Sequence, residues 1–302
     1  MNPYAGRTFV VLNPAAGQDD PARGRRQIGG ALAVRGAGFD LMETSGPGDA
    51  ERLAREAANL GYCCVAAAGG DGTIAEVITG LAGGDTPLGI LPLGTGNQLA
   101  ANLGIPLDLE RAVEVLVNGE PTPIDLGQLG NGRYFAIMAG AGWDAEVMSM
   151  ATRELKERWG FGAYLFAGLR KAVTPSSALF RITADDLEFE VSAATVLIAN
   201  VGQLVHSLLP LELRIGPGVS FHDGLLDVCI FAPRNVTDVA AVLWRVARRR
   251  YVGDERLIDL QAREIRVETE PPILTQVDGD LAGDTPLVAR AVPGGVRVML
   301  PR

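Results

Sequence analysis

Short apolar runs alternate with amphipathic segments along the first half of the chain. Within residues 73–81 the apolar side chains recur at i, i+3, i+4 and i+7, which predicts a helix with one apolar face. Strands that alternate with helices predict a parallel sheet covered by helices on both faces. The expected strands are Phe9–Leu12, Phe39–Met42, Cys63–Ala68 and Leu88–Leu91, and the expected helices are one from about Pro21, Asp49–Leu60, Thr73–Leu81, a stretch after Asn97, and Leu109–Asn118.

The pattern changes after Pro121, where short strands separated by turn residues dominate. Many short strands predict an all-β domain. We therefore expect an α/β domain over residues 1–124 and a β-sandwich domain over residues 125–302, with the last residues allowed to pack back on the first domain. The expected strands are Tyr134–Met138, Leu179–Thr183, Leu187–Val191, Thr195–Ala199, Leu226–Phe231, Ile265–Val267, Ile273–Val277 and Val296–Leu300, with helical inserts at Glu154–Val173 and Val236–Arg249.

Composition excludes several classes of protein. The net charge of −9 and the absence of a basic face disfavour nucleic acid as a partner. Three cysteines are too few and too badly spaced for a disulfide framework or a zinc site. No apolar run approaches the ~18 residues of a membrane span, and no signal peptide is evident. We expect a cytoplasmic protein, with peripheral membrane association and a homodimer left open.

Three glycine-rich or Asn-Pro turns directly follow predicted strands of the first domain: Asn13–Gly17, Gly69–Thr73 and Leu93–Asn97. The carboxyl ends of parallel strands line one crevice, so we expect the three turns to face the same ligand. Glycine lets backbone N–H groups approach an anion, and the helix that follows adds its partial positive charge. The turns therefore predict a phosphate-binding site.

This phosphate site must differ from the two common ones. The sequence has no P-loop motif and no dinucleotide fingerprint. Its only two lysines, Lys156 and Lys171, are far from the glycine turns. Phosphate charge would have to be met by backbone N–H groups, arginines, a metal ion, and hydroxyl groups such as those of Thr44, Thr73 and Thr95.

Carboxylates mark the positions where proton transfer or metal binding is conceivable. Asp71 stands between two glycines, either as a cap of the next helix or as a magnesium ligand or proton acceptor. Asp278 and Asp280 follow the strand Ile273–Val277 and are expected to reach out of its end together, where they could accept a proton and help hold magnesium. Asp-Gly is also common in ordinary turns, both here and in the second such segment, His222–Asp227.

The order of these motifs resembles the lipid-kinase family of soluble bacterial diacylglycerol kinases and their sphingosine- and ceramide-kinase relatives. The Gly-Gly-Asp-Gly element alone is shared with NAD kinases and phosphofructokinases, whereas the whole ordered set is more specific. The resemblance implies a nucleotide-binding α/β domain, a β-sandwich domain, and ATP in the cleft between them. The motifs that carry it are Asn13-Pro14-x-x-Gly17, Gly69–Thr73, Leu91–Asn97, Asp223–Asp227 and Val277–Asp280.

The resemblance also implies roles for individual residues. Asp280 takes the place of the family's proton acceptor, which is usually Glu, and Asp278 is its neighbour. Asp223, with the backbone carbonyls of Ser220 and Leu225, resembles the family's magnesium site, although His222 stands where an acid is frequent. The implied nucleotide-binding residues are Asn13, Pro14, Gly17, Thr44, Gly69, Gly70, Asp71, Gly72, Thr73, Gly94, Thr95, Gly96 and Asn97.

The resulting hypothesis is an ATP-dependent lipid kinase that phosphorylates the hydroxyl group of diacylglycerol or a related lipid at a membrane surface. ATP and Mg²⁺ would be required, and Asp280 or Asp71 would take the hydroxyl proton. The segment Trp159–Phe166 is either an apolar membrane-facing surface or an ordinary core helix. Two alternatives are a soluble-substrate kinase of the NAD-kinase type and a nucleotide-binding homologue without catalysis.

Overall fold

Apolar strands and amphipathic helices assemble into two units in the computed structural model. One unit comprises Met1–Leu126 and Gly294–Arg302, and the other comprises Gly127–Pro293. The structure describes residues 2–17, 21–143, 145, 177–201, 203–205, 212–214, 220–233, 237–238 and 256–302. The expected helix Glu154–Val173, with its apolar stretch Trp159–Phe166, lies outside these residues, as does the expected helix Val236–Arg249 apart from Thr237 and Asp238.

The first unit is built on a parallel sheet in which the strands follow the order β2-β1-β3-β4. Every residue of β3 and β4 is buried, because helices cover both faces of the sheet. The end of β18 continues the sheet in parallel beside β4, where Val298 pairs with Leu88. The strands are β1 (Arg7–Leu12), β2 (Gly38–Glu43), β3 (Cys64–Gly69), β4 (Leu88–Pro92) and β18 (Leu287–Leu300).

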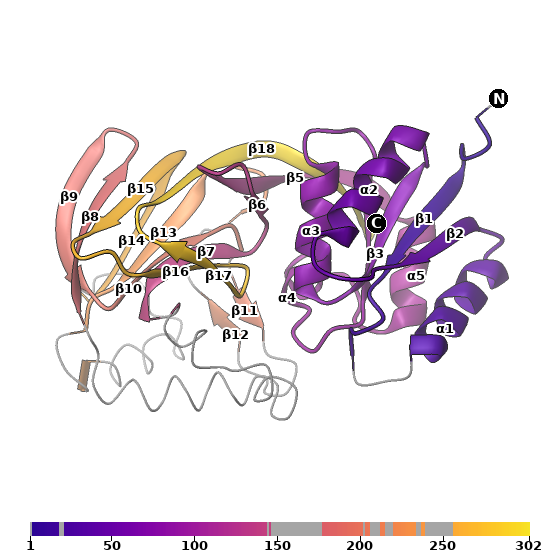
Figure 1. Cartoon of the computed structure of the whole chain (residues 1–302), viewed down its shortest axis with the longest axis horizontal. Helices are drawn as coiled ribbons and strands as arrows, with labels where there is room; N and C mark the ends of the chain where they lie inside the picture. Colours follow the sequence, from indigo (N-terminus) through magenta and orange to yellow (C-terminus); the bar gives the residue numbers. More distant parts are fainter. Residues whose placement is uncertain are drawn as a thin grey trace. The chain divides into compact units, whose positions relative to one another are not determined.

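The helices pack as two pairs on opposite faces of this sheet (Figure 1). The connections from β1 to β2 and from β2 to β3 run in opposite directions across the sheet, and right-handed crossovers therefore place α1 and α2 on opposite faces. Helix α2 packs on α3, and α1 packs on α5. The helices are α1 (Pro21–Val34), α2 (Asp49–Leu60), α3 (Asp71–Leu81), α4 (Gln98–Asn102) and α5 (Leu109–Asn118).

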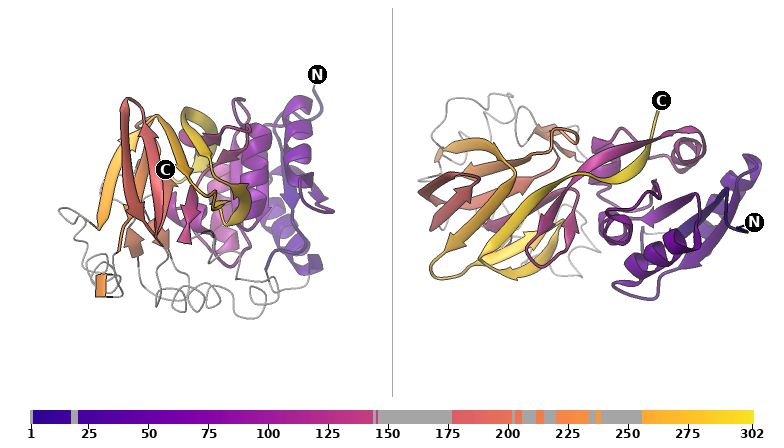
Figure 2. Two further views of the ribbon diagram at one scale, coloured as in Figure 1. Left: turned by 60° about the vertical axis from the view of Figure 1, so that its left-hand side comes forward. Right: turned by 90° about the horizontal axis from the view of Figure 1, so that it is seen from above.

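The second unit is a sandwich of antiparallel sheets (Figure 2). One sheet has the order β14-β13-β10-β7-β16-β17, and its core face meets the face of β18, β15 and β8. Alternating apolar residues from both sheets, such as Phe180 and Ile230, form the core between them. Strand β5 (Glu120–Leu129) begins in the first unit and ends in the second. The other strands of the second unit are β6 (Tyr134–Phe135), β7 (Met138–Gly142), β8 (Ala178–Ala184), β9 (Leu187–Ala193), β10 (Thr195–Ala199), β11 (Gln203–Val205), β12 (Glu212–Arg214), β13 (Leu226–Phe231), β14 (Leu257–Ala262), β15 (Glu264–Thr269), β16 (Leu274–Val277) and β17 (Asp280–Asp284).

The predicted fold class, an α/β domain with a parallel sheet followed by a β-sandwich, is confirmed. One expected strand, Tyr134–Met138, is divided into β6 and β7 at Ala136 and Ile137. In the part of the chain that the structure describes, no helix combines the length and the apolar character that crossing a membrane requires.

Candidate functional site

The three glycine-rich turns lie together at the carboxyl edge of the parallel sheet. Asn13 and Thr73 connect the first turn to the second, because Nδ2 of Asn13 donates to Oγ1 of Thr73 at 2.9 Å. Leu93 connects the third turn to the second, because its N–H donates to the carbonyl of Gly69 at 2.9 Å. The structure therefore brings the predicted phosphate-binding turns to one place.

Two glycines in these turns allow backbone to approach backbone. A Cβ atom on Gly94 would lie 2.5 Å from Cα of Gly70, a distance that real Cβ contacts do not reach. A Cβ atom on Gly17 would lie 2.9 Å from the carbonyl oxygen of Leu93, and Gly17 has a φ of +82°. The turns can therefore contact one another only because Gly17 and Gly94 have no side chains.

The N-terminus of α3 offers backbone donors at the same edge. Helix α3 begins at Asp71 after an N-cap residue, Gly70, that provides no side-chain cap. The first N–H group bonded within the helix is that of Ile74, which donates to the carbonyl of Gly70 at 3.1 Å. A Cβ atom on Gly72 would meet nothing within 4 Å, so the first turn borders open space. Backbone donors and the helix dipole favour an anion here.

The two asparagines of the predicted nucleotide set organise the turns through their side chains. Oδ1 of Asn13 accepts the N–H of Ala15 at 2.9 Å, while its Nδ2 is used by Thr73. Asn97 has a φ of 48° and bonds both backbone groups of Gly94, at 3.0 Å and 2.7 Å. Each amide thus holds its turn in shape through its oxygen and one N–H of its nitrogen.

Asp71 caps a helix, but not the one that it begins. Its Oδ1 accepts the N–H of Leu99 at 3.1 Å, in the first turn of α4, and the N–H groups of Asn97 and Gln98 also bond its carboxylate. Burial raises the pKa of Asp71, and these amides oppose the rise. Oδ2 of Asp71 would lie 2.9 Å from a Cβ atom on Gly96, which shows how closely the third turn wraps this carboxylate.

Two predicted hydroxyl residues stand at the same edge. The N–H of Thr44 donates to the carbonyl of Leu12 at 2.9 Å, one residue before Asn13. Thr95 is exposed at the tip of the third turn. The predicted nucleotide-binding residues of the first unit are thus gathered by three adjacent strand ends and by the loop after β2.

In the second unit, the expectation that Asp278 and Asp280 reach out of a strand end together is wrong. Val277 pairs with Asp280, so Asp278 and Gly279 are the two central residues of a hairpin turn, with φ angles of 49° and 91°. Positive φ at both positions defines a type I′ turn. This turn directs the two carboxylates to different surroundings.

The carboxylate of Asp278 is used by backbone donors. It accepts the N–H groups of Ala136 at 3.1 Å, Ile137 at 3.0 Å and Met138 at 2.9 Å, in the break between β6 and β7. Burial raises the pKa of Asp278 to about 6, and the three N–H groups oppose the rise. In contrast, the side chain of Asp280 is 65% exposed and lies 3.5 Å from the guanidinium of Arg133.

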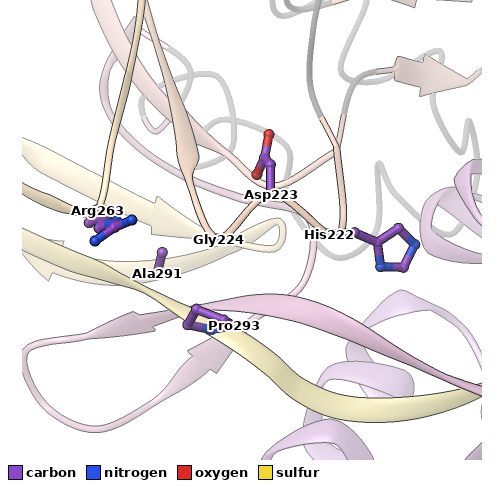
Figure 3. A pocket seen from close by; sticks show the side chains of 6 residues that line it. All are labelled: His222, Asp223, Gly224, Arg263, Ala291 and Pro293. Carbon is purple, nitrogen blue, oxygen red and sulfur yellow. The ribbon is translucent and has the colours of Figure 1, made fainter.

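The predicted magnesium residues Ser220, Asp223 and Leu225 lie in the turn before β13. Oδ1 of Asp223 accepts the N–H of Leu225 at 3.0 Å, and Nε2 of Gln261 is 3.5 Å from Oδ2. Figure 3 shows the carboxylate of Asp223 and the ring of His222 pointing in different directions beside an open pocket of about 410 Å³. The pocket is lined by His222, Asp223, Gly224, Arg263, Ala291 and Pro293.

Comparisons with known proteins match family models to both units of the chain. The family model of the diacylglycerol kinase catalytic domain matches residues 7–129. The family model of the YegS C-terminal NAD kinase beta sandwich-like domain matches residues 137–300. The chain belongs to the diacylglycerol kinase and YegS-like lipid kinase family.

Individual relatives cover nearly the whole chain. A Bacillus subtilis protein named "Diacylglycerol kinase" is 30% identical over 93% of this chain and 91% of its own length. A Pseudomonas aeruginosa protein named "Probable lipid kinase YegS-like" is 34% identical over 92% of this chain and 87% of its own length. A crystal structure described as a diacylglycerol kinase from Bacillus anthracis has a TM-score of 0.72 at 22% identity, covers 98% of this chain and 97% of its own, and shows the shared fold.

In this member of the lipid kinase family, Asp227, the last residue of the motif Asp223–Asp227, is close to a further carboxylate that the sequence does not single out, that of Asp259. Asp227 is 2% exposed, and its pKa is raised to about 6 by burial and by the nearby charges of Asp259 and Asp223. Asp227 lies on β13, and Asp259 lies on the neighbouring β14. The sequence signal of Asp259 is weak, because a single acid within a strand looks like an ordinary exposed position.

The carboxylate of Asp223 is an oxygen ligand of the kind that a magnesium ion takes. Among the described residues, no group of three or more His, Cys, Asp or Glu side chains could enclose a metal. Mg²⁺ commonly keeps several waters and takes only one or two carboxylates. The exposed carboxylate of Asp223 could supply one such ligand, and a cation there would also lessen the repulsion by Asp223 that contributes to the raised pKa of Asp227.

Proposed function

We propose that this protein transfers the γ-phosphoryl group of ATP to the hydroxyl group of a lipid, with diacylglycerol or a related lipid as the acceptor at a membrane surface. The observation that carries the proposal is the meeting of the three turns at the N-terminus of α3, in a chain whose relatives are named as lipid kinases. Phosphoryl transfer depends mainly on positioning and charge neutralisation, which such a donor array supplies.

The residues of the first unit have separate tasks in this proposal. Backbone N–H groups of the turns bind the phosphates, while Asn13 and Asn97 keep the turns in shape and Thr44 and Thr95 contribute hydroxyl groups. No lysine is needed for this mode of binding. Asp71 holds α4 against the second turn through the N–H of Leu99, so that both turns keep one geometry.

The second unit contributes the acid–base group in this proposal. Asp280 accepts the proton of the attacking hydroxyl, since its carboxylate is exposed, whereas that of Asp278 is occupied by three amides. Magnesium, held beside Asp223, would supply positive charge for a phosphate-bearing ligand. Asp278 then fixes the turn from which Asp280 projects.

The test is transfer of labelled phosphate from ATP to vesicles containing diacylglycerol, ceramide, sphingosine or monoacylglycerol. We expect a phosphorylated lipid with the wild type and a loss of at least about 100-fold in kcat for Asp280→Ala, the size of a removed general base. Asp284→Ala, at the other exposed end of β17, is the matched control and should keep its activity.

Two outcomes would contradict the proposal. Formation of NADP from NAD and ATP, with no lipid product, would assign the protein to the soluble-substrate kinases. Tight binding of ATP measured by calorimetry, with no turnover on any hydroxyl substrate, would show a nucleotide-binding homologue without catalysis. The exposed ion pair between Asp280 and Arg133 is the observation that makes this second outcome worth measuring.

A further inference from the structure

Glu76 uses both of its carboxylate oxygens to hold the start of a neighbouring helix. It lies on α3, one turn beyond Thr73. Its Oε1 accepts the N–H of Gly48 at 3.0 Å, and its Oε2 accepts the N–H of Ala50 at 3.1 Å. Both donors belong to the N-terminus of α2, so one acidic side chain connects the two helices.

The N-terminus of α2 needs a partner of this kind. Its N-cap residue is Gly48, which has a φ of 82° and offers no side chain for capping. The first N–H groups of a helix have no partner within the helix, and a carboxylate close to them is stabilised by the helix dipole. Glu76 therefore supplies from α3 the cap that the sequence of α2 lacks.

The loop before α2 is held at both of its ends. At its beginning, Oδ2 of Asp49 accepts the N–H of Ser45 at 2.8 Å and also the Ser45 hydroxyl. These bonds, with that of Arg52, lower the pKa of Asp49 to about 2. At its end, Gly48 is held by Glu76. A loop with two glycines would otherwise have many accessible conformations.

Thr44, the predicted nucleotide contact, is the first residue of this loop and directly follows β2. Its N–H is bonded to the carbonyl of Leu12 at the end of β1, which places its backbone beside the first glycine turn. The end of the loop is bonded to α3, which begins at the second glycine turn. Thr44 is thus held between two elements that both carry predicted phosphate-binding turns.

Helices α2 and α3 are packed closely enough to transmit such a constraint (Figure 1). A Cβ atom on Gly80 of α3 would lie 2.5 Å from the carbonyl oxygen of Glu51 and 2.9 Å from Cβ of Ala54. The helices therefore meet with no side chain between them at this point. Glu76 bonds the start of α2 one turn earlier on the same helix, so α3 contacts α2 at two successive turns.

We propose that Glu76 is a positioning residue for nucleotide recognition, acting through the loop 44–48 to fix Thr44 relative to the Gly69–Thr73 turn. This inference rests on the function proposed above, since the ligand it concerns is a nucleoside triphosphate. Glu76 does not touch the nucleotide. Its contribution is to keep the hydroxyl of Thr44 and the N–H groups of α3 at one separation.

This role predicts a particular kinetic signature. A constraint that acts on the bound nucleotide in the ground state and in the transition state alike changes KM without changing kcat. For Glu76→Ala we expect KM for ATP to rise about tenfold, as for the loss of one hydrogen bond to a charged group, with kcat unchanged within about twofold. Glu76→Gln keeps one carbonyl acceptor and should show a smaller rise.

The experiment is a double-mutant cycle on ATP affinity, measured by calorimetry and by KM, with Glu76→Ala, Thr44→Ala and the double variant. Residues that act through one another give non-additive changes. We therefore expect the double variant to bind ATP no more weakly than the weaker single variant. Glu56→Gln, an exposed acid on α2 that pairs with Arg52, is the control and should bind ATP as the wild type does.

The outcomes separate this inference from the proposed function. Additive losses in the cycle, or unchanged affinity in Glu76→Ala, would overturn the positioning role while leaving ATP binding intact. A wild type that does not bind ATP would overturn the proposed function, and this inference with it. Hydrogen exchange of the Ser45–Ala50 amides distinguishes a local change from global unfolding. Protection of these amides should fall in Glu76→Ala and stay unchanged in Glu56→Gln.

Discussion

The two units build their candidate sites in different ways. In the first unit the donors are backbone N–H groups of turns that follow parallel strands, and the side chains of Asn13, Asn97 and Asp71 hold those turns in place. In the second unit the candidate groups are carboxylates, and the backbone of the turn determines where Asp278 and Asp280 point. A backbone site tolerates little added volume, whereas a carboxylate site is sensitive to charge and to turn geometry.

The largest expected effect comes from adding one methyl group to the backbone site. In Gly94→Ala the new Cβ atom would lie 2.5 Å from Cα of Gly70, so the second and third turns must separate. We expect the ATP affinity to fall at least about 100-fold and the unfolding free energy to fall by about 2 kcal/mol. Calorimetry with ATP and thermal denaturation measure the two quantities.

Gly30→Ala is the matched control for this variant. It lies within α1, where an added Cβ atom meets nothing within 4 Å. Alanine in a helix interior is favoured over glycine by about 0.5–1 kcal/mol, so this variant should gain stability and keep its ATP affinity. Wild-type affinity in Gly94→Ala would show that the close approach of the two turns is not needed for binding.

The second comparison is between the two carboxylates of one turn. Asp278→Ala leaves the N–H groups of Ala136, Ile137 and Met138 without their acceptor, and we expect it to lower the unfolding free energy by about 2 kcal/mol. Asp280→Ala removes an exposed ion pair and should change the same quantity by less than about 0.5 kcal/mol. The effect on activity should be different. Asp280→Ala should lose activity while it keeps the stability of the wild type.

Urea denaturation followed by tryptophan fluorescence measures this difference in the second unit, because Trp143, Trp159 and Trp244 all belong to its sequence range. The slope m should be the same in both variants. Equal losses of stability in the two variants would contradict the structural role of Asp278. Asp284→Ala again provides the control on β17.

The sequence predicts the backbone site better than the carboxylate site, for a physical reason. Helices α2 and α5 begin and end at the predicted residues, because their apolar periodicity is regular. The meeting of the three turns follows from the rule that parallel strands share a carboxyl edge. Strands β5, β14 and β17 were not expected, because prolines in β5 and acidic residues in β14 and β17 interrupt the apolar alternation.

Contacts between distant segments account for the rest of the site. The side chain of Asp278 points inward because the type I′ turn sets its direction. Its carboxylate accepts N–H groups of residues 136–138, which are far away in the sequence. Glu76 looks like an ordinary polar position of α3, since its partners Gly48 and Ala50 stand before and within another helix. Periodicity reports which face of an element is buried, but not which distant donors a polar side chain meets.

The smallest expected effect concerns Asp227 and the dependence of stability on pH. Folding raises the pKa of this carboxyl to about 6, so the folded state binds its proton more tightly than the unfolded chain, in which an ordinary Asp titrates near ~3.9. Its contribution to the unfolding free energy therefore increases as the pH falls through about 6 and is lost as the pH rises again. Between pH 7 and pH 5 we expect this gain to be about 1 kcal/mol.

Asp227→Asn should remove this part of the pH dependence, because the amide does not titrate. In a chelator, the wild type should gain about 1 kcal/mol relative to the variant when the pH falls from 7 to 5, read from tryptophan fluorescence in urea. Asp186→Asn, an exposed acid in the turn between β8 and β9, should follow the wild type at both pH values. Parallel pH profiles for Asp227→Asn and the wild type would show that burial and the charges of Asp259 and Asp223 do not hold this proton, and would weaken the case for a cation beside Asp223.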